Sequence, residues 1–204
     1  NAPHDSRVNV GVVHEADEKA VAQAMASASM QQHDWDLLGG TARAAIPDKA
    51  ASLFEEKSAR LMALLVQEAG KTLDNALLEL REAVDFLRYY AAQSLSLKAA
   101  PVGTVTCISP WNFPLAIFTG QIAAALAAGN TVVAKPAEQT PLIAEAAVKL
   151  FYEVGLPRDV LQLVQGDGAV GGKLVADPRI AGVAFTGSTE VARLINRALA
   201  AKDG

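Results

Sequence analysis

Three short motifs follow one another in the second half of the chain, each directly after a short apolar run. Residues 109–114 read Ser-Pro-Trp-Asn-Phe-Pro, residues 135–141 read Lys-Pro-Ala-Glu-Gln-Thr-Pro, and residues 185–188 read Phe-Thr-Gly-Ser. The apolar runs alternate with stretches of helical length, which is typical of parallel strands joined by helices. The motifs therefore constrain both the fold and the place where a ligand would bind.

The second half predicts an α/β fold. Strands are expected at 104–109, 131–135, 160–165 and 182–186, and helices at 115–128, 141–154, 169–176 and 189–201. Right-handed crossovers between such strands give a Rossmann-like parallel sheet with flanking helices. The strand runs 132–134 and 183–185 do not alternate with polar residues, which predicts strands covered on both faces. Thr140 and Pro141 predict the N-cap and first residue of a helix, and Gly155 with Pro157 predicts its end.

The first hundred residues predict a mainly helical segment. Helices are expected at 15–31, at 43–69 with Pro47 marking a start or a break, and at 73–93. An apolar stripe on the last helix comprises Leu73, Leu77, Leu80, Val84, Leu87 and Ala91. Charged residues on this helix, Glu79 among them, are expected to form weak surface pairs of about 0.3 kcal/mol each. We therefore predict two domains, a helical segment at 1–100 that packs on an α/β domain at 101–204.

Composition excludes several classes of protein. The net charge of −4 carries no block of like charges, so neither a nucleic-acid groove nor an anionic membrane surface is expected. No apolar stretch reaches the roughly 20 residues of a membrane span, and no signal peptide is recognisable. A single cysteine excludes an internal disulfide and a cysteine-based zinc site, and the three histidines lack metal-ligand spacing. A reducing cytoplasm is the expected compartment.

The candidate binding residues gather at the carboxyl ends of the predicted strands, where parallel α/β sheets bind ligands. Residues 166–171 also match G-x-G-x-x-G between a strand and a helix, but the acidic residue expected about 20 positions later is missing. Either a dinucleotide loop or a plain Gly-rich turn fits this segment.

Single residues in these motifs leave alternatives open. Ser188 can help to bind a phosphate at a helix N-terminus or can simply cap that helix. Lys135 and Glu138 can hold a nucleotide or can be solvated loop charges. Asn112 can donate to a developing oxyanion or can be a buried amide that satisfies backbone groups. Cys107, inside a predicted strand, is expected to be an inert buried thiol.

Taken together, the three motifs resemble the NAD(P)-dependent aldehyde dehydrogenase superfamily, from about residue 15 to the end of the chain. The likeness is greatest to the glutamate-semialdehyde (pyrroline-5-carboxylate) dehydrogenase module of bifunctional proline utilization A proteins. It is carried by Leu-Leu-Val-Gln-Glu-Ala-Gly-Lys at 64–71, by Glu-Leu-Arg-Glu-Ala-Val-Asp at 79–85 with Tyr89-Tyr90, and by residues 111–121.

The resemblance implies a role for each motif residue. Asn112 would be the catalytic side chain that stabilises the oxyanion. Lys135 and Glu138 would hold the adenosine ribose, with Glu138 favouring NAD over NADP. The remaining cofactor-binding residues would line the cleft or contact adenine and pyrophosphate: Ile108, Ser109, Pro110, Trp111, Gly168, Phe185, Gly187, Ser188 and Val191. No metal is implied.

The resemblance also implies an activity. The parent enzyme would oxidise glutamate γ-semialdehyde to glutamate in proline catabolism with NAD as cofactor, as a homo-oligomer; FAD would enter only with a separate proline dehydrogenase module. The family's cysteine nucleophile and general-base glutamate lie beyond Gly204, so the expected fold is a truncated one and the chain alone is expected to be inactive. The alternatives are an aldehyde dehydrogenase of another substrate class, a non-catalytic nucleotide-binding module, and a purely structural α/β domain.

Overall fold

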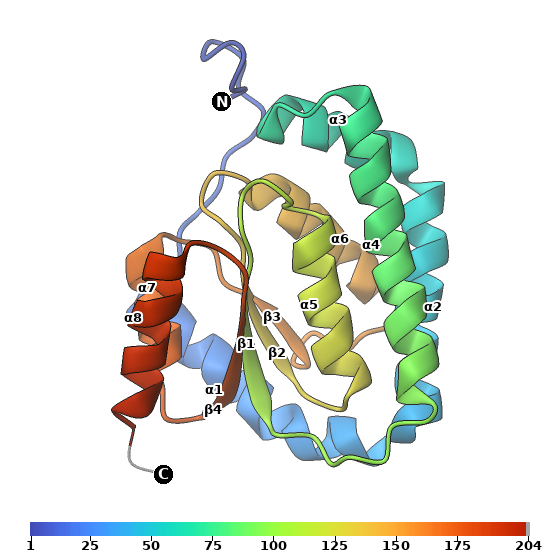
Figure 1. The fold of residues 1–204 in the computed structure, drawn as a ribbon, viewed down its shortest axis with the longest axis vertical. Helices are drawn as coiled ribbons and strands as arrows, with labels where there is room; N and C mark the ends of the chain where they lie inside the picture. The colour runs from blue at the N-terminus through green and yellow to red at the C-terminus, as the bar shows by residue number, and fades with distance from the viewer. Residues whose placement is uncertain (203–204) are drawn as a thin grey trace.

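A parallel sheet of four strands runs through the middle of the computed structural model, which describes residues 1–202 (Figure 1). The strands are β1 (Thr104–Ile108), β2 (Val132–Lys135), β3 (Leu161–Leu163) and β4 (Ile180–Phe185). Their order in space is β3-β2-β1-β4, so the chain steps from β1 out to β3 and then crosses back to place β4 on the other side of β1. Successive strands are therefore added first on one side of β1 and then on the other, and the strand order changes direction between β1 and β4.

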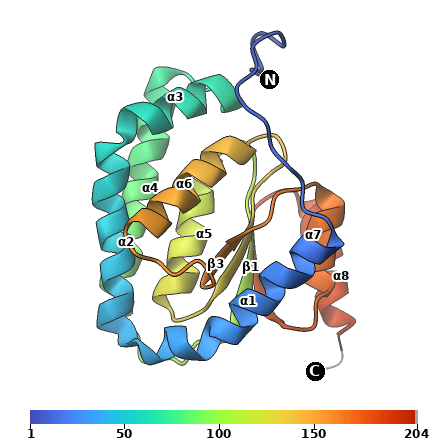
Figure 2. The same ribbon diagram turned by 180° about the vertical axis from the view of Figure 1, so that it is seen from behind.

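Helices follow the strands as the sequence predicts, and the α/β fold is confirmed. They are α5 (Ala116–Ala127), α6 (Pro141–Glu153), α7 (Gly168–Ala176) and α8 (Thr189–Ala200). Helices α5 and α6 lie on one face of the sheet, while α7 lies on the other face and carries α8 on its outer side (Figures 1 and 2). Strand β2 is buried along its whole length, as expected for a strand between two helical layers.

The N-terminal segment forms α1 (Glu18–Leu37), α2 (Gly39–Glu56), α3 (Ser58–Ala69) and α4 (Leu73–Ser94). Helix α1 joins α7 on one face of the sheet, and α2 and α4 form an outer layer over α5 (Figures 1 and 2). The predicted break at Pro47 is wrong, because this proline lies inside α2 and the helices separate at Lys57. Pro47 is buried, so packing of its ring offsets the backbone hydrogen bond that a proline cannot make.

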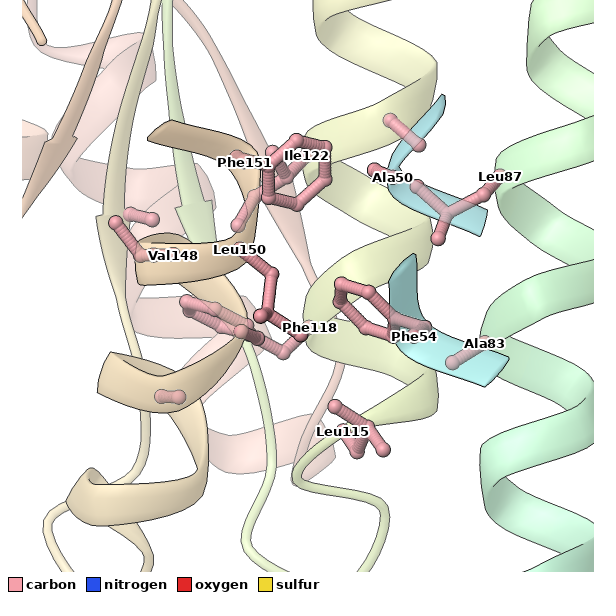
Figure 3. Close-up of a cluster of buried hydrophobic side chains, with 14 of the residues drawn as sticks. Ala50, Phe54, Ala83, Leu87, Leu115, Phe118, Ile122, Val148, Leu150 and Phe151 are labelled. Atoms are coloured by element: carbon pink, nitrogen blue, oxygen red, sulfur yellow. The ribbon is translucent and has the colours of Figure 1, made fainter. Parts of the chain in front are cut away.

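One continuous hydrophobic cluster joins the two halves of the chain. In Figure 3, Phe54 of α2 lies between Leu87 of α4 and the side chains of α5 and α6. The rings of Phe54 and Phe151 meet edge to face with centroids 6.2 Å apart. The helical segment and the sheet thus share their core, and the division into two domains near residue 100 stays a prediction.

Two packing predictions are wrong in part. Leu73 and Leu77 at the start of α4 are 69% and 45% exposed, because neighbouring helices cover the face that carries Ala76 and Ala83 instead. On β4, residues 183–185 are only half-buried. This strand lies at the edge of the sheet and pairs with β1 alone among the described strands, and of the described helices it is chiefly α7 that packs against it. Across residues 1–202, no helix has the length and apolarity that a membrane span requires.

Candidate nucleotide-binding cleft

A cleft of about 620 Å³ opens at the carboxyl ends of β1, β2 and β4. It lies where the strand order changes direction, which is where open α/β sheets bind their ligands. Its volume falls within the range of roughly 300–1,000 Å³ that is usual for small-molecule sites. The structure brings these predicted site residues together in its wall: Ser109, Pro110, Trp111, Asn112, Glu138, Phe185, Gly187, Ser188 and Val191.

Three predicted site residues lie outside this wall. Ile108 is the last residue of β1 and is half-buried. Lys135 is the last residue of β2, and its side chain is buried. Gly168 is the exposed first residue of α7, after β3, at the far side of the sheet from β4.

The turn after β1 presents its side chains to solvent. Asn112 is exposed, so the alternative of a buried amide that satisfies backbone groups is wrong. Trp111 is 57% exposed and forms cleft wall rather than core. The backbone N–H of Ser109 donates to the carbonyl of Lys135, which continues the sheet pairing into the first residue of the turn. An exposed amide on a turn fixed in this way is free to donate to a bound group.

Lys135 and Glu138 differ strongly in their exposure to solvent. The Lys135 side chain is 5% exposed, and its Nζ donates to the carbonyl of Pro136 at 2.9 Å. Its Nζ also lies 3.8 Å from a carboxylate oxygen of Glu138, whose side chain is 47% exposed. Burial lowers the pKa of Lys135, and the Glu138 carboxylate partly opposes that shift. The alternative of two solvated loop charges is therefore wrong for Lys135, and buried cations of this kind cluster at functional sites.

The N-terminus of α8 faces the cleft and carries a side-chain cap. Ser188 accepts a hydrogen bond from the N–H of Val191 at 3.2 Å, so the capping interpretation holds for its hydroxyl. The first four N–H groups of a helix have no intrahelical partner, and this cap uses one of them. Gly187 precedes the cap in the cleft wall, so backbone donors of the first turn stand beside the cleft together with the positive end of the helix dipole.

The Gly-rich turn at 166–171 differs from the α8 N-terminus, because an acidic side chain of the turn already binds the backbone N–H groups of its helix. The Asp167 carboxylate accepts from the N–H groups of Ala169 at 2.8 Å and Val170 at 3.3 Å. A negative side chain therefore occupies the place that a phosphate would take at the α7 N-terminus. These contacts favour the plain turn over the dinucleotide loop at this segment.

Two buried glutamates cap the starts of α5 and α6, a role that the sequence predicts for neither. Glu68 of α3 accepts from the N–H groups of Leu142 and Ile143 at 2.7 and 2.9 Å, and burial raises its pKa although both hydrogen bonds lower it. Glu79 of α4 accepts from the N–H groups of Leu115 and Ala116 at the start of α5. The prediction that Glu79 forms surface pairs is wrong, because its side chain is 1% exposed. The sequence does not distinguish Glu79 from an exposed helix charge, because Leu115 and Ala116 lie 36 and 37 positions further along the chain.

A third missed residue, Gln121 of α5, joins the two strands that border the cleft. Its side-chain amide donates to the carbonyl of Ile108 at 3.3 Å and to the Thr186 hydroxyl at 3.1 Å. Nothing in the sequence signals this contact, because Thr186 lies 65 positions further along the chain.

The single cysteine takes no part in the cleft. Cys107 is fully buried in β1, and burial raises the pKa of its thiol to about 12. Because the thiolate is the reactive form, this residue is inert, as expected. Among the residues that the structure describes, no three or more His, Cys, Asp or Glu side chains are grouped to hold a metal ion.

Comparison with known proteins gives consistent matches. The sequence pattern of the aldehyde dehydrogenase family matches residues 1–204. The bifunctional protein PutA of Klebsiella aerogenes is 53% identical over 98% of this chain, which spans 16% of the length of PutA. A crystal structure of bifunctional proline utilization A superposes with a TM-score of 0.90 at 52% identity, covering 95% of this chain and 22% of that one. A 1-pyrroline-5-carboxylate dehydrogenase from Thermus with bound NAD superposes with a TM-score of 0.87 at 35% identity, covering 90% of this chain and 39% of that one.

Proposed function

The chain belongs to the aldehyde dehydrogenase family, and on this premise we propose that it forms the NAD-binding part of a dehydrogenase that oxidises an aldehyde. The observation that carries the proposal is the cleft between β1 and β4, because motif residues far apart in the sequence line one wall at the usual binding position of the fold. The relative from Thermus, described with bound NAD, supports the choice of cofactor.

Lys135 and Glu138 would hold the adenosine ribose. An exposed carboxylate in the cleft wall can accept hydrogen bonds from both ribose hydroxyls, and its charge repels a 2′-phosphate. The buried Lys135 ammonium has a backbone carbonyl as its close partner, so it can donate further hydrogen bonds towards the ribose. NAD is therefore the preferred cofactor over NADP. Gly187 and Ser188, at the α8 N-terminus, would meet the pyrophosphate.

Asn112 would act on the aldehyde. When NAD is bound, its nicotinamide ring accepts a hydride. The carboxamide N–H₂ of Asn112 would donate to the oxygen that becomes negative when the aldehyde carbon is attacked, a contribution that is often worth about 3 kcal/mol. Cys107 does not supply the attacking thiolate, because its thiol is buried and its pKa is about 12. We therefore propose that these 204 residues alone do not turn over an aldehyde.

The proposed substrate is glutamate γ-semialdehyde, the open form of pyrroline-5-carboxylate, which would be oxidised to glutamate in proline catabolism. The names of the relatives, bifunctional protein PutA and 1-pyrroline-5-carboxylate dehydrogenase, support this substrate over another class of aldehyde. We propose a cytoplasmic homo-oligomer. The partly exposed strand β4 and exposed large apolar side chains such as Leu73 and Leu95 favour association with another copy.

Calorimetric titration with NAD tests the proposal. We expect binding that weakens about tenfold in Glu138→Ala, the loss of about 1.5 kcal/mol from charge-assisted hydrogen bonds. The same variant is expected to narrow the preference for NAD over NADP, because the repulsion of the 2′-phosphate is removed. Glu145→Ala, on an exposed face of α6, is the matched control and is expected to bind NAD as the wild type does. Equal NAD affinity in wild type and Glu138→Ala would contradict the proposed role of this loop.

A further inference from the structure

A largely buried ion pair contacts the turn that carries Asn112 and the helix that follows it. The Glu79 carboxylate lies 2.6 Å from Nζ of Lys71, and the two side chains are 1% and 14% exposed. Glu79 also accepts from the N–H groups of Leu115 at 2.8 Å and Ala116 at 3.3 Å. The same Lys71 ammonium stands over the Phe113 ring, 4.3 Å from its centroid. Two residues of the helical segment thus reach both Phe113 and the start of α5.

Beyond the ion pair itself, these contacts all reach one very short stretch of the chain. Leu115 and Ala116 come directly after Pro114, and Phe113 comes directly after Asn112. Helix α5 has no side-chain cap of its own in the described structure, so Glu79 supplies the acceptor at its N-terminus. The other end of the turn is held by Ser109, whose N–H donates to the Lys135 carbonyl. The backbone on either side of Asn112 is therefore fixed at both ends, and Lys71 adds a contact at the adjacent ring.

A local cap would have satisfied α5 more simply. A serine, threonine or aspartate at the N-cap accepts from the first turn without involving another segment. Here a carboxylate from α4 takes that role, and its counter-ion reaches to the ring beside Asn112. This arrangement makes the geometry of the turn depend on the helical segment.

We propose that Lys71 and Glu79 are positioning residues that hold Asn112 and Phe113 in place at the cleft. Neither residue lines the cleft, so both act through the turn. Their importance for catalysis rests on the proposed function of Asn112, whereas the positioning itself does not. A group that stabilises an oxyanion must be fixed before reaction, which gives the turn a reason to be held by more than its two prolines.

Nuclear magnetic resonance of the ¹⁵N-labelled full chain tests the proposal. In Glu79→Ala we expect hydrogen exchange at the Leu115 and Ala116 amides to accelerate at least about tenfold, with increased motion of the Asn112 backbone and carboxamide. Lys71→Met should increase motion at Phe113 and Asn112, and Lys71→Arg should restore order because it keeps a cation in place. Glu79→Gln keeps one acceptor for α5 but loses the attraction to Lys71, so it should resemble Lys71→Met.

Glu68→Ala is the matched control, because Glu68 is also a buried carboxylate that caps a helix but contacts α6 instead of the turn. It should accelerate exchange at Leu142 and Ile143 and leave Asn112 unchanged. Unaltered order at Asn112 and Phe113 in folded Lys71→Met and Glu79→Gln would overturn the proposal. The readout needs no nucleotide, so a failed NAD titration would refute the proposed function and leave this result standing.

Discussion

Lys135 combines deep burial with weak pairing. Its carboxylate neighbour Glu138 is half in solvent and 3.8 Å away, beyond hydrogen-bond distance, while the nearer partner is the neutral carbonyl of Pro136. A buried cation without a close counter-ion opposes folding. A buried residue that opposes folding is typical of functional sites, where stability is given up for binding.

Replacing Lys135 separates these two effects. We expect Lys135→Met to weaken NAD binding about tenfold, the loss of one charged hydrogen bond, without lowering the free energy of unfolding at neutral pH. Burial lowers the pKa of Lys135, so the folded protein loses this proton at lower pH than the unfolded chain. The stability of the wild type relative to Lys135→Met therefore rises as the pH increases through the lowered pKa towards the ordinary value of 10.5.

Urea unfolding of both proteins at about pH 7 and about pH 9.5 measures this difference. Lys19→Met, at an exposed position of α1, is the control and should show no such change over this range. A stability difference between wild type and Lys135→Met that stays constant with pH would show that burial does not perturb this lysine.

At the scale of the helices, α6 is capped in an unexpected way. Thr140 stands at the N-cap position, but its buried hydroxyl has no hydrogen-bond partner among the described residues. Glu68, from α3, instead accepts from the N–H groups of Leu142 and Ile143. The predicted helix start is correct, and the predicted capping side chain is wrong.

Stability measurements distinguish the two caps. Glu68→Ala removes both acceptors and should lower the free energy of unfolding by about 1–2 kcal/mol. Thr140→Ala removes a hydroxyl that caps nothing and should change it by less than about 0.5 kcal/mol. Denaturant unfolding at neutral pH gives both values. The reverse ranking would mean that Thr140 is the functional cap in solution.

How well the sequence predicts these elements depends on how far apart along the chain the interacting residues lie. Strands and helices after residue 100 could be located because Pro141, Gly155 and the apolar runs act locally. Glu68 and Glu79 could not be interpreted correctly, because a glutamate within a helix usually faces solvent and their partners lie 74 and 36 positions away. The exposure of β4 depends on strand order, which no local pattern encodes. The cleft was predictable in outline because parallel strands bring their carboxyl ends to one edge.

At the scale of the whole molecule, the helical segment and the α/β part share one hydrophobic core. Phe54 of the helical segment and Phe151 of the α/β part belong to the same hydrophobic cluster (Figure 3). Buried carboxylates, including Glu79, join the helical segment to the first turns of α5 and α6. The cleft turn that carries Asn112 is attached to this shared structure through Glu79 and Lys71.

We expect the two halves to unfold together. Thermal unfolding followed by far-ultraviolet and near-ultraviolet circular dichroism should give one coincident transition. Phe54→Ala should lower the free energy of unfolding by about 3–5 kcal/mol, because it leaves a cavity in the shared core. Hydrogen exchange should then accelerate in α6 as well as in α2. Separate transitions, or acceleration confined to α2, would favour two independently stable domains.

The location of bound NAD is the most direct test of the central claim. Amide chemical shifts of the ¹⁵N-labelled chain, recorded during titration with NAD, identify the residues at the binding site. Shifts concentrated at 109–113, 137–139 and 185–191 are the predicted result, because these segments form the cleft between β1 and β4. Shifts confined to the α7 N-terminus around Gly168, or no shifts in a chain that is demonstrably folded, would contradict a nucleotide site at this cleft.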